Sequence, residues 1–320
     1  MVKFAVIGAG AGGQSMAAIL SSQGHSVKLY DIDKEKIRQL RELDAIKVSG
    51  VIECQAKPDV ITDKMEEVMT DVDVVMIVST TDAHRSIALE CSPYLKDGQI
   101  IMLNPGHCGG ALELSNILRG EHGCGKDLII AEAGDLMYGC RSYEVGNILH
   151  TGLKVHVPVA TLPAGDIDRL MEVLGPVFPC LKPAANVLET GFEGAGAMLH
   201  PIPSLMNINK MDLGESYDYY MEGITPHVAD IITVCDKERV AVCRALGVEA
   251  LALGDMLVKT YKLEPKETLY DLIQSIDSYR ALRNPTSTKH RFIVEDTMSG
   301  LVPLASVGHA LGIPTPMMDA

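Results

Sequence analysis

The sequence predicts an α/β protein, in which a Rossmann-like, doubly wound parallel sheet is followed by a mostly α-helical second domain. In the first half, near-continuous apolar runs alternate with helical patterns, which is typical of strands buried on both faces. A glycine-rich turn follows the first of these runs. From about residue 186 the apolar residues recur at helical spacing instead. We therefore predict two domains, residues 1–185 and 186–320.

The individual elements follow from the same patterns. In the first domain buried strands are predicted at 2–7, 26–31, 71–79, 98–104 and 127–133, and helices at 14–24 and 34–43. Short antiparallel strands separated by glycines are predicted over 140–160, with a helix over 164–175. In the second domain, residues 228–247 predict a long helix for which Thr225 and Pro226 supply a cap and a first-turn proline.

Composition excludes several classes of function. The chain has 320 residues with 47% hydrophobic and 22% charged residues, which is typical of a globular protein. A formal net charge of −14 and the lack of any basic run argue against a nucleic-acid partner. The apolar runs are much shorter than the roughly 20 residues of a membrane-spanning helix. The N-terminus enters a strand pattern directly, so we expect a cytoplasmic protein, and we also expect a homodimer.

The eight cysteines contain no CxxC pair, and we expect them to be free thiols. Two segments, 107–108 and 122–124, place a histidine beside a cysteine. Neither has a second Cys/His pair at the spacing of a zinc site. We interpret both as loops and predict no metal.

The first glycine-rich turn predicts a dinucleotide site. Gly8, Gly10 and Gly13 form the pattern G-x-G-x-x-G directly after a strand and at the start of a helix. These glycines allow a tight turn, a close approach of the backbone to a pyrophosphate, and close packing of the helix on the strand. The start of the helix presents free N–H groups to the phosphates. A glycine turn without a ligand is the alternative.

Asp31, at the end of the second strand, predicts the choice of cofactor. A carboxylate there accepts hydrogen bonds from a ribose diol and repels a 2′-phosphate, which favours NAD(H) over NADP(H). Three nearby cations, Lys34, Lys36 and Arg38, weaken this preference, so NADP(H) stays an alternative cofactor. The carboxyl ends of two further strands face the same crevice, and we expect their polar residues near the nicotinamide: Thr80, Thr81, His84 and Asn104.

A second set of residues predicts acid–base chemistry. His200 ends a short apolar run and is followed by Pro201. Arg291 and Asp296 lie five residues apart, about 1.4 helical turns, so they point in different directions and need not pair with each other. Asp296 would then hydrogen-bond one nitrogen of His200, while Arg291 binds a substrate carboxylate. The alternative is a core histidine with a structural hydrogen bond.

Several blocks of the sequence resemble the octopine/nopaline-type opine dehydrogenases. In the second half these are "VLETGFEGAGAMLHP", "YYMEGITPHVADIITVCDKERVAVCRALG" and the region around "KHRFIVEDTMSGLVPLASVG". In the first half "NPGHCGGALELSNIL" and "IIAEAGDLMYGCRSYEVG" are similar to that family. The resemblance implies an enzyme that joins an amino acid to a 2-oxo acid such as pyruvate and reduces the imine with a nicotinamide cofactor. It also implies a catalytic pair of His200 and Asp296, with Arg291 near a substrate carboxylate.

One departure from the family concerns the substrates. Members usually carry asparagines shortly before the His-Pro pair, where this chain has Gly194 and Gly196. The identity of the amino acid and the 2-oxo acid therefore stays open. Side chains in segments expected to line the same cleft are Asn207, Tyr220 and Thr225, although each also fits a cap or a packing residue.

Two other functions fit the same residues. A reductase that converts a 2-oxo or 3-oxo acid directly to a hydroxy acid would need the cofactor and His200, but no amine. A non-catalytic NAD(H) sensor would need only the glycine turn and Asp31. The polar set of His200, Arg291 and Asp296 distinguishes an enzyme from the sensor, because a sensor has no use for it.

Overall fold

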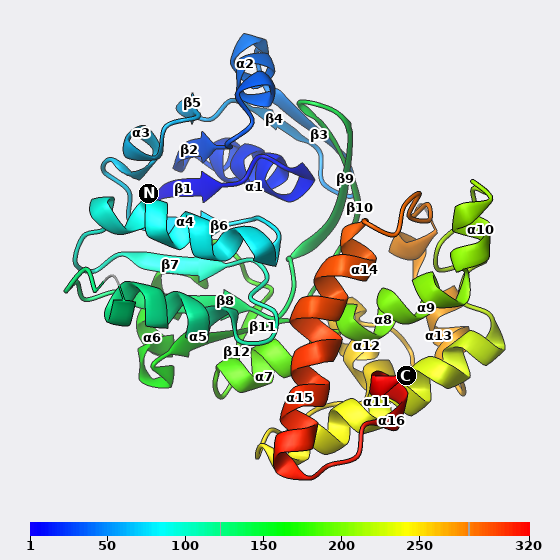
Figure 1. The fold of residues 1–320 in the computed structure, drawn as a ribbon. Helices are drawn as coiled ribbons and strands as arrows, with labels where there is room; N and C mark the ends of the chain where they lie inside the picture. Colours follow the sequence, from blue (N-terminus) through cyan, green and yellow to red (C-terminus); the bar gives the residue numbers. More distant parts are fainter. Residues whose placement is uncertain (122, 281) are drawn as a thin grey trace. The chain divides into compact units, whose positions relative to one another are not determined.

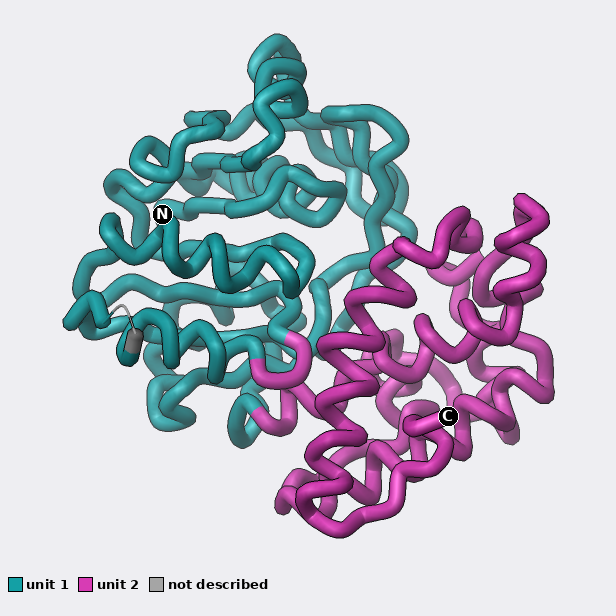
Figure 2. The backbone as a smooth tube through the Cα atoms, in the orientation of Figure 1, with its two compact units in different colours: residues 1–106, 110–187 teal, residues 107–109, 188–320 magenta. Residues whose placement is uncertain are grey.

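The computed structural model describes residues 1–121, 123–280 and 282–320. The chain forms two compact units (Figure 2). Unit 1 comprises residues 1–106 and 110–187, and unit 2 comprises residues 107–109 and 188–320. The predicted limits of 1–185 and 186–320 differ from these units by two residues at the boundary and by the short segment 107–109. As limits of independent domains they stay a prediction.

Unit 1 contains the predicted doubly wound sheet, and the fold class is confirmed. The order of its eight described strands is β12-β11-β8-β7-β6-β1-β2-β5. The six from β5 to β8 in this order are mutually parallel, whereas β11 runs antiparallel to β8. The bounds are β1 Lys3–Ile7, β2 Ser26–Tyr30, β5 Val60–Thr62, β6 Val74–Ile77, β7 Ile100–Leu103, β8 Ile129–Ala133, β11 Val157–Leu162 and β12 Leu181–Pro183.

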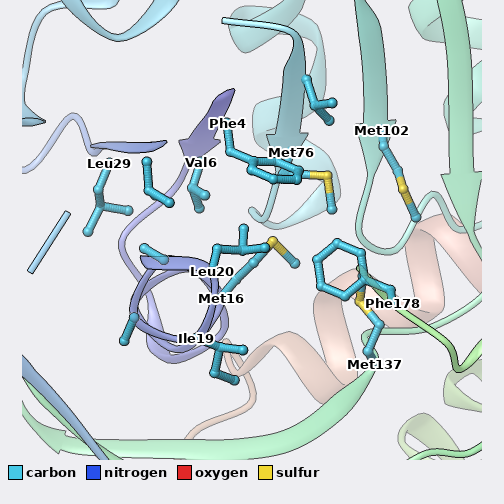
Figure 3. Packing of buried hydrophobic residues seen from close by; sticks show 14 of the residues in the cluster. Phe4, Val6, Met16, Ile19, Leu20, Leu29, Met76, Met102, Met137 and Phe178 are labelled. Carbon is cyan, nitrogen blue, oxygen red and sulfur yellow. The ribbon is translucent and has the colours of Figure 1, made fainter. Parts of the chain in front are cut away.

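Helices cover both faces of this sheet, as its apolar strands require. One buried cluster includes residues of α1, α2 and α6, and the cluster on the other face includes residues of α3, α4 and α5. Figure 3 shows the first cluster, where Met16 and Leu20 of α1 lie beside Val6 of β1 and Met76 of β6. The bounds are α1 Ala11–Ser22, α2 Lys34–Glu42, α3 Met65–Met69, α4 His84–Cys91, α5 Gly110–Ser115 and α6 Ile167–Leu174.

A second, four-stranded sheet in the described part of unit 1 was not predicted as such. Its order is β4-β3-β10-β9, and it packs against α1. The sequence prediction recognised only β9 and β10, and it missed β3 and β4. The signal in β3 is a short alternation in which Ile46 and Val48 are buried. The bounds are β3 Ile46–Gly50, β4 Cys54–Ala56, β9 Tyr138–Glu144 and β10 Asn147–Leu153.

Unit 2 is helical, as predicted (Figure 1). Its core is arranged around α11 (Pro226–Ala245), which contacts α8, α9, α13, α15 and α16. None of the helices in the described part of the chain is long and apolar enough to cross a membrane. The remaining bounds are α7 Val187–Phe192, α8 Gly196–Leu199, α9 Pro201–Met206, α10 Ile208–Asp212, α12 Leu253–Tyr261, α13 Leu269–Gln274, α14 Arg291–Asp296, α15 Val302–Leu311 and α16 Pro316–Asp319.

Candidate active site

His200 lies at the junction of two short helices in unit 2. It ends α8 and precedes α9, whose first residue is Pro201. A proline suits the first position of a helix, because the N–H group that it lacks has no partner within the helix. The hydroxyl of Tyr219 donates to the carbonyl oxygen of His200 at 2.6 Å. The backbone of His200 is therefore fixed at a defined place between the two helices.

Asp296, the last residue of α14, meets His200 as predicted. Its Oδ2 lies 2.9 Å from His200 Nδ1, although the two residues are 96 positions apart. The Asp296 side chain is 1% exposed and that of His200 is 16% exposed. Burial by itself would raise the pKa of Asp296. The charge and hydrogen bond of His200, with smaller effects of His107 and Arg291, nevertheless hold that pKa below its ordinary value.

The carboxylate of Asp296 is therefore ionised near neutral pH. An ionised carboxylate only accepts hydrogen bonds, so Nδ1 of His200 carries a proton and donates it to Asp296. This is the arrangement of a carboxylate that orients an acid–base histidine. The catalytic role of His200, against the alternative of a core histidine with a structural hydrogen bond, stays a prediction.

Tyr220 contacts the other ring nitrogen of His200, which sequence reasoning had placed only in the vicinity. Its hydroxyl lies 3.0 Å from Nε2. The ring of Phe292 stacks on the imidazole at 3.8 Å between centroids and 11° between planes. Tyr220 in turn stacks on Tyr279 at 4.0 Å. Both nitrogens and one face of the imidazole are thus engaged, which leaves the ring little freedom to turn.

Gly196 explains how the carboxylate reaches the histidine. A Cβ at position 196 would collide with Oδ1 of Asp296. A larger residue there would displace the carboxylate from His200. The departure from the family at this position is therefore accommodated by the packing of Asp296. A Cβ at Gly194 would make only an ordinary contact, 4.0 Å from the carbonyl oxygen of Gly191, so this position carries no such constraint.

Arg291 does not pair with Asp296, in agreement with the predicted spacing. Its guanidinium lies 3.7 Å from Oε2 of Glu295 and rests over the ring of Phe292. The same Glu295 faces His107, whose Nε2 is 3.6 Å from Oε1. Arg291 is therefore already engaged, loosely, by a carboxylate that the sequence prediction overlooked. Its side chain is 46% exposed, and its contact with a substrate stays a prediction.

The two other predicted substrate residues make internal hydrogen bonds. Nδ2 of Asn207 donates to the carbonyl oxygens of Pro203 and Gly223. The hydroxyl of Thr225 accepts from the N–H of Val228 and caps α11, which confirms the predicted cap. These bonds position the segments around His200. Binding of substrate by either side chain stays a prediction.

The glycine turn of unit 1 has the shape that a dinucleotide requires. Gly8 has a φ of 107°, and a Cβ there would collide with the carbonyl oxygen of Val78. A Cβ at Gly13 would collide with the carbonyl oxygen of Gly8, whereas nothing lies within 4 Å of one at Gly10. No side chain caps the start of α1, so its first N–H groups are available to an anion.

Polar atoms at the ends of neighbouring strands fit the same ligand. Oγ of Ser79, after β6, and Oδ1 of Asn104, after β7, are buried and have no hydrogen-bond partner among the described residues. Buried polar atoms without a partner are rare, and these lie where ligands of such sheets bind. Asp31, 8% exposed, follows β2 at the same edge. The residues present therefore fit a nicotinamide dinucleotide. Thr80 is exposed beside Ser79, and its contact with the cofactor stays a prediction.

Sequence reasoning missed Tyr219, Phe292 and Glu295 as neighbours of the candidate pair. The two aromatic residues carried a weak signal, because both lie within the sequence blocks that resemble the opine dehydrogenases. Of the two His–Cys segments, His107 faces Glu295, whereas His122 lies outside the described residues. In the described part of the chain no group of three His, Cys, Asp or Glu side chains is placed to hold a metal ion.

Comparisons with known proteins match both units. Residues 183–320 match the family model of the NAD/NADP octopine/nopaline dehydrogenase α-helical domain. Residues 3–117 match the N-terminus of NAD-dependent glycerol-3-phosphate dehydrogenase. A curated opine dehydrogenase of Arthrobacter sp. (strain 1C) is 35% identical over 318 residues, which cover 99% of this chain and 88% of that protein.

Solved structures share the fold along the whole chain. An octopine dehydrogenase in complex with NADH and agmatine has a TM-score of 0.80 at 21% identity, over 100% of this chain and 87% of that one. An octopine dehydrogenase structure with NADH and pyruvate has a TM-score of 0.77 at 22% identity, with the same coverage. A yersinopine dehydrogenase with bound NADP+ has a TM-score of 0.75 at 15% identity, over 100% and 88% of the two chains.

Proposed function

This chain belongs to the opine dehydrogenase family, and from that premise we propose that it joins the amino group of an amino acid to a 2-oxo acid such as pyruvate. It is an NAD(P)H-dependent oxidoreductase that acts on CH–NH bonds. The observation that carries the proposal is the hydrogen bond of 2.9 Å between His200 and the buried, ionised Asp296. A sensor that only binds a dinucleotide would have no use for this pair.

The proposed reaction begins with attack of the neutral amine on the carbonyl carbon of the 2-oxo acid, which forms a carbinolamine. Protonated His200 donates its Nε2 proton to the departing hydroxyl, which leaves as water and gives an iminium ion. Asp296 holds Nδ1–H throughout and stabilises the charge on the ring. The substrate oxygen takes the place of the Tyr220 hydroxyl on Nε2 during this step.

Arg291 is proposed to bind a substrate carboxylate. The guanidinium is half exposed and held only loosely by Glu295, so it can turn towards a planar anion without a large loss. A fixed carboxylate would orient the iminium carbon relative to the cofactor. We propose that Asn207 and Thr225 shape this region, because their hydrogen bonds fix the segments around it.

The dinucleotide would be held by Gly8, Gly10 and Gly13 at the start of α1 and by Asp31 at the ribose. When bound, it supplies the hydride that converts the iminium ion to a secondary amine. NAD(H) is proposed as the preferred form because of Asp31, with NADP(H) also accepted. The relatives support both forms, since octopine dehydrogenase was solved with NADH and yersinopine dehydrogenase with NADP+.

The remaining proposals concern the setting of the enzyme. No disulfide joins any of the eight cysteines in the described part of the chain, which fits a reducing compartment, and we propose that the protein is cytoplasmic. We also propose a homodimer that needs neither nucleic acid nor a membrane. Light scattering coupled to size-exclusion chromatography measures the oligomeric state directly.

An amine-dependent assay tests the function. NADH oxidation is followed with pyruvate and other 2-oxo acids, each with and without a panel of amino acids. The proposal expects oxidation only when both substrates are present, and a secondary-amine product by mass spectrometry. Oxidation that ignores the amine would identify a hydroxy-acid dehydrogenase instead. Binding of NADH without turnover on any pair would favour the sensor.

A further inference from the structure

The carboxylate of Asp31 is held by the backbone on two sides. Oδ2 accepts the N–H of Ala9, in the glycine turn, at 2.7 Å. Oδ1 accepts the N–H of Asp33, the cap of α2, at 2.9 Å. These bonds fix the carboxylate between the turn and the start of α2. Its negative charge therefore cannot swing away from a ribose that binds at this edge.

Lys36 neutralises this charge. Its ammonium lies 3.1 Å from Oδ2 of Asp31 and 4.0 Å from Oδ2 of Asp33. The Lys36 side chain is 28% exposed, so its end is accessible at the rim of the site. A carboxylate that is paired with a lysine repels a nearby phosphate much less than an unpaired one does. The flexible stem of a lysine also allows its ammonium to change partners.

The other two cations after Asp31 are placed differently. Arg38 is bound by two carboxylates of its own helix, Glu35 at 2.6 Å and Glu42 at 2.7 Å. Lys34 is exposed at the first position of α2, and the described ion pairs of Asp31 do not include it. Of the three cations that the sequence offered, only Lys36 contacts the residue that selects the cofactor.

We propose that Lys36 sets the dinucleotide selectivity of this chain. It pairs with Asp31 when the ribose carries a free 2′-hydroxyl, and with the phosphate when the ribose carries a 2′-phosphate. The exchange of partners lets one site accept both NADH and NADPH. The proposal rests on the dinucleotide site of the proposed function and names the residue that decides between its two ligands.

Binding, rather than turnover, tests the proposal. Dissociation constants of NADH and NADPH are measured by the fluorescence of the reduced nicotinamide, at one fixed ionic strength, for the full-length wild type and for Lys36→Gln. Loss of one charge-assisted contact is expected to weaken NADPH roughly tenfold relative to NADH. Lys34→Gln removes the same charge two residues away and controls for the general field. It should shift the NADPH-to-NADH ratio by less than about twofold.

Asp31→Asn should change the relative affinity for NADPH and NADH in the opposite direction to Lys36→Gln. Without the carboxylate, Lys36 is free for the phosphate, and NADPH should gain on NADH. An equal ratio in Lys36→Gln and Lys34→Gln would overturn the role of Lys36 while leaving the dinucleotide site in place. A wild type that binds NADH but not NADPH would overturn it too. Binding of neither dinucleotide would instead overturn the proposed function, and the inference with it.

Discussion

Two histidines differ in their partners: His150 of unit 1 is buried and His200 of unit 2 is half-buried. His150 on β10 is 1% exposed, contacts the hydroxyl of Ser15 through Nε2 and packs on the ring of Tyr138 at 4.7 Å. Its Nδ1 has no hydrogen-bond partner among the described residues. Burial lowers the pKa of His150 to about 4, so the ring is neutral near neutral pH. His200 instead holds a buried carboxylate on Nδ1.

The difference teaches that a charged partner matters as well as burial. Both rings are largely removed from water and both contact a hydroxyl. Only His200 has an ionised carboxylate on one of its ring nitrogens. His150 therefore serves packing beneath α1, whereas the acid–base role is proposed for His200, which has the carboxylate partner. The following predictions separate the two histidines, beginning with the largest effect.

Replacement of His200 should have the largest effect. His200→Ala removes the proposed general acid, so we expect kcat to fall roughly 10⁴-fold. The dissociation constant of NADH should stay nearly unchanged, because the glycine turn and Asp31 are untouched. His150→Asn is the matched control and should retain kcat. A rate like that of the wild type in His200→Ala would remove His200 from the mechanism. The two histidines would then not differ in catalytic role.

Asp296→Asn should come next. The amide keeps the shape of the side chain but cannot stabilise the protonated ring, so we expect kcat to fall roughly 10²-fold. The alkaline limb of the pH–rate profile should move to lower pH, because the imidazolium has lost its counter-charge. Unfolding by urea checks that the variant is folded. An unchanged profile would indicate that Asp296 only supports the packing of α14.

The pH dependence of stability should reveal His150. The pKa of the ring is about 4 in the folded chain and near 6.5 when unfolded, so the unfolded state binds more protons between these values. Stability must therefore fall as pH falls through this window and level off below it. Between pH 7 and pH 5 we expect a loss of about 2 kcal/mol.

Urea unfolding followed at a series of pH values measures this loss. His150→Asn keeps a partner for Ser15 but does not titrate, so the difference between wild type and variant isolates the ring. The variant is expected to be less stable at pH 7 and to show a flatter pH dependence. Parallel curves for the two proteins would mean that the buried ring is not the proton acceptor.

The hydroxyl partners should give the smallest effects. Tyr220→Phe removes the contact on Nε2 of His200, and we expect kcat to change by less than about tenfold, with a change in the pH–rate profile. Ser15→Ala removes the corresponding contact of His150 and should lower the free energy of unfolding by about 1 kcal/mol with kcat retained. Effects in the reverse pattern, on stability for Tyr220 and on rate for Ser15, would contradict the assignment of roles.

Much of unit 1 could be predicted because its signals are local. The glycine turn, Asp31 and the buried strands each occupy a short stretch whose pattern reflects its immediate surroundings. The strands β3 and β4 escaped prediction because they lack the near-continuous apolar runs that mark the buried strands. Lys36 was recognised as a nearby cation, but only the turn of α2 decided that it, and not Arg38, would meet Asp31.

The sequence by itself determined the alternation of strands and helices, the dinucleotide turn, and the residue types that acid–base chemistry needs. The tertiary structure decided which of those residues meet: Asp296 with His200 across 96 positions, Tyr220 on the second nitrogen, and Glu295 beside Arg291. The physical reason is that a pattern along the chain specifies which face of an element is buried. Which two buried faces touch depends on how elements far apart in the chain pack, and at Gly196 that packing leaves just the space a carboxylate requires.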